Sequence, residues 1–306
     1  MYKKIIILIL FILPLPLLAN PCTQATQLVI QAYDLGISAY VRQKTLLQQA
    51  LNLCSNHADA HNNLGVILEN EQNYSQAIHH YQRALRINPD YQEAWIGMGD
   101  VYFKQGQFPL SLDAYLNACT RDNPMRNQRI AELLDKNNYR TVTDKNMLKQ
   151  ESLGILYDTK QLEKLRNKVI ECHSRYRSVA PTLDPDSILE TFVVFRNIHF
   201  DVGKYLLTPA AEQQLDEIGR TLLKKGTKSI QISGHTDIQT FKDASLAESN
   251  KLNFILSQQR AASVANSLVK RGISKITTKG YGNIKPAQGY TEENLDKNRR
   301  VEIELK

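Results

Sequence analysis

The sequence predicts a two-domain α+β protein, in which an all-α array of helical repeats precedes an α/β sandwich. Between residues 64 and 118, small and aromatic residues recur with a period of 34 residues, which is typical of stacked helix-turn-helix units. From residue 191 onward, short apolar runs alternate with amphipathic helical segments, as expected for one sheet covered by helices. A chain of 306 residues is long enough for two such cores.

The composition excludes several classes of protein. Hydrophobic residues make up 42% of the chain and charged residues 23%, which indicates a globular protein and argues against disorder. The 14 glycines and 10 prolines are too few for a collagen-like or low-complexity chain. The net charge of +7 is modest, and the repeat region is slightly acidic, so we expect no nucleic-acid partner.

Residues 1–19 are predicted to be a secretory signal peptide. Lys3 and Lys4 precede an apolar run that ends at Leu18, and Ala19 is small enough for cleavage. This run is too short to span a bilayer comfortably, and no later stretch approaches spanning length. We therefore expect no transmembrane span in the mature chain. An uncleaved anchor and a lipid on Cys22 are the alternatives.

The period in the first half of the chain carries a recognisable pattern. Small residues stand where two helices must approach closely, and large residues fill the groove between the helices. This pattern resembles the tetratricopeptide repeat, and we assign residues 22–124 to such repeats, with a degenerate first unit at 24–57. The matching residues are Leu64, Gly65, Leu68, Ala77, Tyr81, Ala84 and Pro89, then Trp95, Met98, Gly99, Tyr102, Tyr115 and Ala118.

The resemblance implies a concave surface, on which we expect another, unidentified envelope protein to dock. A simple spacer is the alternative. We expect Tyr33 and Tyr40 to be packing residues rather than parts of a ligand cage.

The four cysteines of an exported chain are expected to form disulfides. In an antiparallel helical hairpin, the start of the first helix lies beside the end of the second. Cys22 and Cys54 occupy these two ends, so we predict a Cys22–Cys54 bond, which leaves Cys119 to pair with Cys172. Four buried, unpaired cysteines are the alternative. No two cysteines have close metal-ligand spacing, and we expect neither a metal ion nor a cofactor.

Residues 125–190 are predicted to be a helical linker region. Apolar residues recur at roughly helical spacing among many charged ones, which favours a solvated helical face. Pro181 and Pro185 indicate a boundary before the next domain.

The C-terminal domain is assigned to residues 191–306. Strands are predicted over 191–200, 229–233, 276–279 and 301–305. A first helix is expected to begin at Thr208 and Pro209 and to end before Gly226. A second helix is expected to begin near Ser257 and to end before Gly272.

Several motifs in this domain resemble the OmpA-like peptidoglycan-binding domain, and they occur in the order of that family. They are Ile232–Asp237, Asn253–Ala261, Gly272-Ile273, Gly280–Gly282 and Asn298–Val301. The sequence departs from the family pattern at residues 238–252, where we expect an enlarged loop that lacks the usual glycine.

The resemblance implies that the ligand is the peptide stem of peptidoglycan, typically its diaminopimelate, and that Asp237 and Arg260 make the central contacts. A carboxylate can pair with the ammonium group of the ligand, and a guanidinium can bind its carboxylate through two parallel hydrogen bonds. If Ser257 caps the helix, Arg260 lies in the first turn, where the helix dipole favours the same anion. The alternative is an internal salt bridge between the two side chains.

Four further residues are expected to border this site, as contacts or as groups that shape the loops: Thr236, Asn253, Arg299 and Arg300. We interpret His235 as a structural, hydrogen-bonding histidine, because no nucleophile or set of metal ligands accompanies it.

The sequence therefore predicts a non-enzymatic cell-wall-binding protein in the periplasm of a Gram-negative-type bacterium, either free or associated with the outer membrane. Three alternatives remain open. The C-terminal domain could have lost ligand binding and serve as a scaffold, or the chain could be a peptidoglycan hydrolase or amidase. A wall anchor resembling a motor stator is the third alternative, and it would need a true transmembrane helix.

Overall fold

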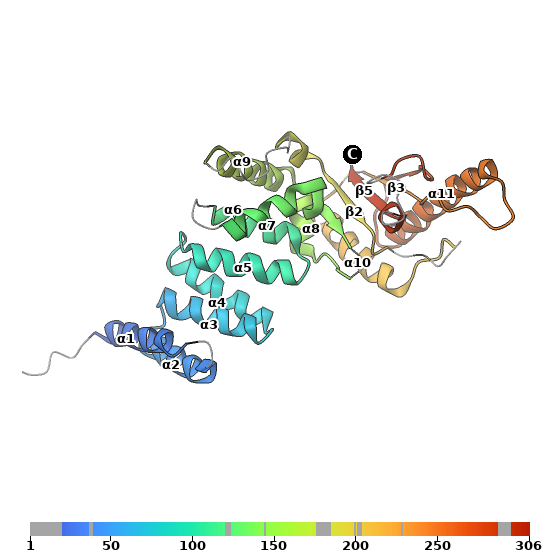
Figure 1. Ribbon diagram of the computed structural model, residues 1–306. Coiled ribbons are helices and arrows are strands. Elements are labelled where there is room, and N and C mark those ends of the chain that lie inside the picture. The colour runs from blue at the N-terminus through green and yellow to red at the C-terminus, as the bar shows by residue number, and fades with distance from the viewer. Residues whose placement is uncertain are drawn as a thin grey trace, which may run out of the picture. The chain divides into compact units, whose positions relative to one another are not determined.

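The computed structural model describes residues 20–36, 39–119, 124–143, 145–175, 185–198, 200, 204–227, 229–286 and 295–306. The chain forms two compact units, Met1–Pro89 and Asp90–Lys306 (Figure 1). The predicted signal peptide, residues 1–19, lies outside the described residues. Across the part of the chain that the structure describes, none of the helices is both long enough and apolar enough to cross a bilayer.

The first unit consists of two antiparallel helical hairpins. Its helices are α1 (Pro21–Asp34), α2 (Tyr40–Leu53), α3 (Ala58–Asn70) and α4 (Tyr74–Ile87). Tyr81 of α4 is fully buried against Gly65 of α3, so the small residue of the repeat pattern admits the large one. A disulfide joins Cys22 to Cys54, as the hairpin geometry predicted, with the two Cα atoms 4.9 Å apart.

The next helical pair of the repeat pattern belongs to the second unit. It consists of α5 (Gln92–Lys104) and α6 (Phe108–Asn117), which are followed by α7 (Pro124–Leu134) and the 3-10 helix η2 (Asp135–Arg140). The predicted array of residues 22–124 is therefore divided between two compact units. The second disulfide joins Cys119 to Cys172 within the larger unit.

Residues 125–190 do not form a solvated linker, which corrects the expectation from the sequence. They contribute β1 (Thr141–Val142), α8 (Gln150–Leu156), α9 (Thr159–Arg175) and the 3-10 helix η3 (Pro185–Leu189). Five apolar residues of α8 and α9 are buried in the same core as the sheet, whereas Ile170 is exposed. The five buried residues are Leu153, Leu156, Leu162, Leu165 and Val169. Their helical spacing gives α8 and α9 an apolar stripe, and this stripe packs against other elements rather than facing water.

Two buried glutamines form hydrogen bonds with the backbone of the segment before α8. Gln107, in the turn between α5 and α6, donates a hydrogen bond to the carbonyl of Met147 and accepts one from the amide of Lys149. Gln214 donates to the carbonyl of Leu148 and accepts from the amide of that residue. Since buried polar groups are costly when unpaired, these contacts fix the second helical pair to the C-terminal domain.

The sheet has five strands in the order β1-β2-β5-β3-β4. The remaining strands are β2 (Phe192–Phe195), β3 (Ile230–Gly234), β4 (Ile276–Gly280) and β5 (Val301–Leu305). β1 runs parallel to β2 and β3 runs parallel to β4, whereas β5 is antiparallel to both of its neighbours. The first C-terminal strand is shorter than the predicted 191–200.

The helices of the C-terminal domain cover one face of this sheet. Val193, Ile303 and Ile232 lie opposite one another in the register, and all three are fully buried. They share a core with α10 (Pro209–Lys224) and α11 (Leu246–Lys270), whose places are visible in Figure 1. The C-terminal domain is therefore the α/β sandwich that the sequence predicts, with the short helix α12 (Leu295–Asn298) before the last strand.

Helix α11 begins earlier than the sequence analysis expected. Its N-cap is Ser245, whose side chain accepts a hydrogen bond from the amide of Glu248 while the Glu248 carboxylate accepts from the amide of Ser245. This reciprocal pair is a capping box, which satisfies two free amides at a helix start. The expectation of a helix start near Ser257 is wrong, and so is that of an enlarged loop over 238–252, because residues 246–252 are helical.

Candidate functional site

The ends of β3 and β4 lie close to the middle of α11. A Cβ atom on Gly234, the last residue of β3, would overlap the carbonyl oxygen of Ser257, and one on Gly280 would lie 2.5 Å from the hydroxyl oxygen of Ser257. Only glycine permits this approach, because both distances are shorter than a van der Waals contact. The Ser257 hydroxyl in turn accepts a hydrogen bond from the amide of Gly282 at 2.9 Å. The approach brings Arg260, one turn farther along α11, to the end of β3.

Asp237 follows the end of β3 and is buried, with 6% of its surface exposed. One carboxylate oxygen accepts a hydrogen bond from the amide of Gln239 at 3.0 Å. The other oxygen lies 2.6 Å from Nη1 of Arg299. The direct ion pair of Asp237 is therefore with Arg299, whereas the internal salt bridge considered above was one with Arg260.

Arg260 lies beside this ion pair and is also buried. Its Nε donates a hydrogen bond to the carbonyl of Lys204 at 3.2 Å, and its guanidinium lies 5.1 Å from the centre of the Phe200 ring. Burial lowers the pKa of Arg260, while the nearby carboxylate of Asp237 raises it. Asp237 and Arg260 are thus close enough to interact electrostatically, as the resemblance implied.

The position of Arg260 within its helix differs from the expectation. Arg260 lies in the middle of α11, which begins at Leu246, and Ser257 is an interior residue rather than a cap. The dipole and free amides of a helix N-terminus act only over its first turn. They therefore contribute nothing at Arg260.

The other predicted site residues have distinct surroundings. Asn253 donates a hydrogen bond from its side chain to the carbonyl of Gln239 at 3.1 Å, which ties the loop after Asp237 to α11. Arg300 pairs with Glu302 at 2.7 Å and donates to the carbonyl of Lys285. Thr236 is buried, and its hydroxyl oxygen has no hydrogen-bond partner.

His235 is buried beside these groups and stacks on the ring of Tyr281, with ring centres 5.1 Å apart. Its Nε2 lies 3.5 Å from a carboxylate oxygen of Glu302, and among the described residues neither ring nitrogen meets the geometry of a hydrogen bond. Burial lowers the pKa of His235, so the ring is neutral at neutral pH. Although burial by itself raises the pKa of Glu302, His235 and Arg300 more than offset this effect and lower it to about 2.

Beside these side chains lies a cavity of about 50 Å³. Its lining residues are Ile198, Phe200, His235, Arg260, Arg299 and Arg300. Since a water molecule needs roughly 10–15 Å³ of such space, the cavity has room for a few waters.

Sequence reasoning missed three residues that support the site. Phe200 faces the guanidinium of Arg260, the carbonyl of Lys204 accepts from it, and Glu302 holds Arg300. The alternation of residues in the last strand placed Glu302 on the outer face, but nothing in the sequence linked these three to the site. Among the described residues, no group of three or more His, Cys, Asp or Glu side chains is arranged to hold a metal ion.

Comparison with known proteins agrees with these features. Residues 199–300 match the sequence profile of the OmpA family. This segment is an OmpA-family domain. Residues 58–91 match the profile of the tetratricopeptide repeat, and this range contains the helices α3 and α4.

Several curated proteins are similar to part of this chain. The chain is 34% identical over 148 residues to the probable lipoprotein YiaD of Escherichia coli, which covers 47% of this chain and 61% of that protein. It is 33% identical over 121 residues to the peptidoglycan-associated lipoprotein of Buchnera aphidicola, which covers 39% and 65%. It is 32% identical over 109 residues to outer membrane protein P5 of Haemophilus influenzae, which covers 35% and 29%. The chain thus spans less than two thirds of the length of each of these relatives, whose names agree with a place in the Gram-negative envelope.

The arrangement in the OmpA-family domain suits one kind of ligand chemistry. A buried carboxylate and a buried guanidinium lie at the same strand end, and charge-assisted hydrogen bonds to such groups are worth roughly 1.5–3 kcal/mol each. The unpaired Thr236 hydroxyl and His235 Nδ1 add neutral hydrogen-bonding atoms. A small molecule that carries both an ammonium and a carboxylate offers a partner of opposite charge to each of Asp237 and Arg260.

Proposed function

We propose that this chain is a non-enzymatic protein of the periplasm that binds the peptide stem of peptidoglycan through its OmpA-family domain. The observation that carries the proposal is the pair of buried side chains of opposite charge, Asp237 and Arg260, at the end of β3. The unpaired hydroxyl of Thr236 and the unpaired Nδ1 of His235 support it. Buried polar atoms without partners are uncommon in folded proteins and suggest that a ligand completes the site.

The chemistry of diaminopimelate matches these groups. Its free end carries an ammonium and a carboxylate on one carbon atom. Asp237 is suited to the ammonium and Arg260 to the carboxylate. A stem peptide with lysine in place of diaminopimelate has the ammonium but lacks this carboxylate, so we expect the site to prefer diaminopimelate.

Pull-down with purified sacculi tests this proposal. We expect the wild-type chain to sediment with sacculi and the Asp237→Asn and Arg260→Gln variants to lose most of this binding. Arg220→Gln is a matched control, because Arg220 is exposed on α10 and pairs only with Glu217 among the described residues. Equal binding by wild type, Asp237→Asn and Arg260→Gln would refute the site.

The same assay separates the alternatives. Release of soluble muropeptides from the sacculi would indicate a hydrolase or amidase. No binding by a folded wild-type chain would favour a scaffold whose C-terminal domain has lost its ligand. Binding to lysine-containing and diaminopimelate-containing stem peptides with equal affinity would overturn the assignment of Arg260 to the second carboxylate.

We further propose that the first unit docks another envelope protein. A groove of about 750 Å³ lies between α1, α2 and α3, and Tyr33 and Tyr40 on its rim are 79% and 52% exposed. Of the aromatic residues that we expected to be packing residues, Tyr33 and Tyr40 are exposed, whereas Tyr74, Tyr91 and Trp95 are partly buried. A photo-cross-linking residue in place of Tyr40 should capture a partner in cells, whereas the same residue at Ile87 of α4, which does not line the groove, should not.

A further inference from the structure

The three arginines of the site are held in different ways. Arg260 is fixed by the carbonyl of Lys204 and the ring of Phe200. Arg300 is fixed by Glu302 and by the carbonyl of Lys285. By contrast, within the described part of the chain the guanidinium of Arg299 contacts only the carboxylate of Asp237.

The ion pair between Arg299 and Asp237 is uneven in exposure. The side chain of Arg299 is 46% exposed, whereas that of Asp237 is 8% exposed. An exposed cation therefore covers a buried anion. Because Arg299 is half in water, it can leave the carboxylate without losing the hydration of its own charge. If Asp237 lost its counter-ion with nothing in return, its buried charge would be left unpaired, which is costly.

The cavity beside these groups is small and does not extend to Asp237. It measures about 50 Å³, and Asp237 is not among its lining residues, so a ligand that pairs with this carboxylate needs Arg299 to move. Arg260, Arg299 and Arg300 all line this cavity. Since Arg260 and Arg300 are held by other groups, Arg299 is the lining arginine that can move away at least cost.

We propose that Arg299 is a built-in counter-ion, which occupies the place of the ligand's ammonium on Asp237 and keeps the pocket closed until the ligand displaces it. The inference rests on the proposed function, because it assumes that Asp237 receives the ammonium. Binding is then an exchange of one cation for another. Only the difference in free energy between the Asp237–ammonium and Asp237–Arg299 ion pairs contributes to affinity. A ligand without a free ammonium cannot displace Arg299 and so cannot open the site.

Variants of Arg299 test the exchange directly. The full chain is titrated calorimetrically with a soluble stem peptide that contains diaminopimelate. In Arg299→Gln no ion pair has to be broken, so the peptide should bind roughly 3- to 10-fold more tightly than to wild type, the range expected for a partly exposed ion pair. Arg299→Lys keeps a weaker competing cation and should fall between the two. Weaker binding by Arg299→Gln would show instead that Arg299 contacts the ligand, and would overturn the inference.

The loss of Arg299 leaves the Asp237 carboxylate buried and unpaired, so folding of the variants must be measured as well. We expect Arg299→Gln to have a lower melting temperature than wild type and to gain more degrees on saturation with the stem peptide. Arg299→Lys retains a charge at this position and provides a folded variant if Arg299→Gln unfolds. If saturation raised the melting temperatures of wild type and variants equally, the inference would fail.

Chemical modification gives a readout that a purely structural role would not change. Phenylglyoxal modifies exposed guanidinium groups, and peptide mapping locates the modified arginine. Saturation with the stem peptide should increase the rate at which Arg299 of the wild-type chain is modified, because displacement exposes the side chain. Arg220, on the surface of α10, should react at the same rate with and without ligand. Protection of Arg299 by the ligand would overturn the inference.

The outcomes separate this inference from the proposed function. If wild type fails to bind the stem peptide, or if Asp237→Asn binds as tightly as wild type, the proposed function fails and the inference fails with it. If wild type binds, Asp237→Asn does not, and Arg299→Gln binds more weakly than wild type, only the role of Arg299 is wrong. An N-acetylated diaminopimelate peptide lacks the free ammonium. If the proposed function holds, this peptide should not bind to wild type, whether or not Arg299 has the inferred role.

Discussion

The phenolic hydroxyl of Tyr157 donates a hydrogen bond to the carbonyl oxygen of Ile303 at 3.2 Å. Tyr157 comes directly after α8, and Ile303 lies in the middle of β5, the central strand of the sheet. Both residues are buried, and burial raises the pKa of Tyr157 well above its usual value. The segment between the repeats and the sheet is therefore part of the core that supports the candidate site.

A fragment of residues 191–306, the domain as assigned from the sequence, should be much less stable than a fragment of residues 90–306. The shorter fragment lacks β1, the edge partner of β2, and exposes the part of its core that α8 and α9 cover. Each large apolar side chain that loses burial costs roughly 1.5–3 kcal/mol. Urea denaturation of the two fragments measures the difference. Equal unfolding midpoints would show that residues 90–190 do not support the sheet.

Gly99→Ala should destabilise the larger unit. A Cβ atom at this position would lie 2.6 Å from the ring of Tyr115, which is fully buried. Overpacking of this kind costs roughly 1–3 kcal/mol, which outweighs the gain of up to about 1 kcal/mol from the higher helix propensity of alanine. The free energy of unfolding measured in urea should therefore fall.

Gly154→Ala is the matched control for this substitution. Gly154 also lies inside a helix of the larger unit, α8, but a Cβ atom there would meet no atom within 4 Å. This variant should be as stable as wild type or more stable by up to about 1 kcal/mol. Equal loss of stability in both variants would show that close packing against Tyr115 is not the cause.

Two histidines should make the first unit sensitive to acid. Nδ1 of His61 on α3 lies 3.0 Å from Nδ1 of His80 on α4. Since Nε2 of His61 lies 3.1 Å from the carbonyl of Ser55, it must carry a proton and donate there, and His80 must then donate to His61. When both rings are protonated, each Nδ1 is a donor and this hydrogen bond is lost.

The pKa values of both histidines are lowered in the folded state, which also predicts a loss of stability in acid. Burial lowers the pKa of His61, and burial together with the charges of His61, His79 and Arg83 lowers that of His80 to about 4. Histidines of the unfolded chain titrate near 6.5, so the unfolded state takes up protons first as the pH falls. The contribution of the pair to stability is fully present above roughly pH 6.5 and decreases toward pH 4.

Hydrogen exchange of α3 and α4 in the full chain measures this effect. Each titrating histidine can lower the folding equilibrium constant by up to about tenfold per pH unit, so protection should fall between pH 7 and pH 5. His80→Ala should reduce this dependence, because it removes one of the two titrating rings. The helix should tolerate the substitution, because alanine occupies the equivalent place in the next repeat, at Ala114. His79→Ala is a graded comparison: it removes one of the charges that lower the pKa of His80 but keeps the hydrogen-bonded pair, so it should retain more of the pH dependence than His80→Ala. The same fall in protection in wild type and His80→Ala would refute the role of the pair.

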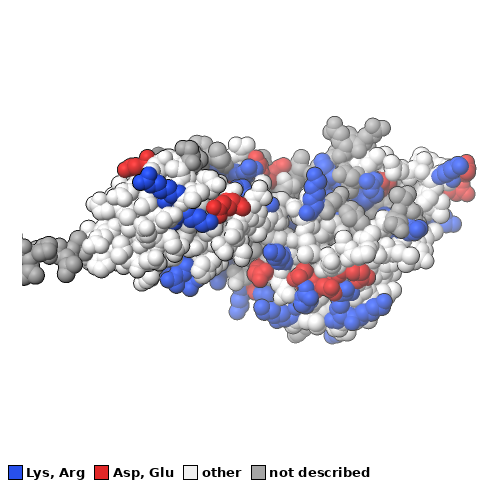
Figure 2. Space-filling model, turned by 90° about the horizontal axis from the view of Figure 1, so that it is seen from below, with Lys and Arg blue, Asp and Glu red and all other residues white. Residues whose placement is uncertain are grey.

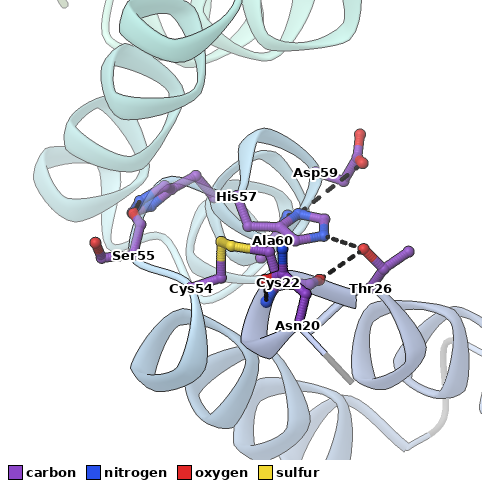
Figure 3. Close-up of a disulfide and its surroundings, with 9 residues drawn as sticks. Asn20, Cys22, Thr26, Cys54, Ser55, His57, Asp59 and Ala60 are labelled. Carbon is purple, nitrogen blue, oxygen red and sulfur yellow. Dashed lines mark hydrogen bonds and ion pairs between the residues drawn. A yellow bond between two sulfur atoms is a disulfide. The ribbon is translucent and has the colours of Figure 1, made fainter. Parts of the chain in front are cut away.

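The disulfide between Cys22 and Cys54 predicts that Cys22 carries no lipid. This disulfide is shown in Figure 3. Close to it, Nε2 of His57 lies 3.0 Å from the hydroxyl of Thr26. Because His57 is the N-cap of α3, this hydrogen bond also links α1 to the start of α3. A sulfur in the disulfide cannot carry a lipid. Non-reducing peptide mapping of the exported protein should therefore find the peptide of Cys22 linked to that of Cys54. Finding an acyl chain on Cys22 would contradict this pairing.

The loss of this disulfide should also lower stability. It closes a loop with a sequence separation of 32 residues, and closure of a loop of this length is worth roughly 3–4 kcal/mol. A Cys22→Ser/Cys54→Ser double variant should therefore unfold at a lower urea concentration in the first unit. An unchanged midpoint would show that packing alone holds α1 against α2.

The sequence predicted the elements whose signals are local. The cap at Thr208 and the proline after it correctly located α10, and alternation of apolar residues located β3 and β5. The signal for the start of α11 was also present, in Ser245 and Glu248, but the motif around Ser257 drew the predicted helix start too far along the chain. The modest net charge of the sequence is matched by the distribution of charges on the surface. Figure 2 shows Lys and Arg side chains interspersed with Asp and Glu on the face displayed.

By itself, the sequence determined the two kinds of domain and the pairing of the cysteines, because these follow from periodicity and chain order. The choice of Asp237 and Arg260 as ligand contacts follows from a motif and stays a prediction. Only the tertiary structure decided which arginine pairs with Asp237 and whether residues 125–190 belong to the core. Both are contacts between residues far apart in the chain, such as Asp237 with Arg299 and Tyr157 with Ile303. Periodicity shows that a helix has an apolar face, but what covers that face depends on the packing of the whole chain.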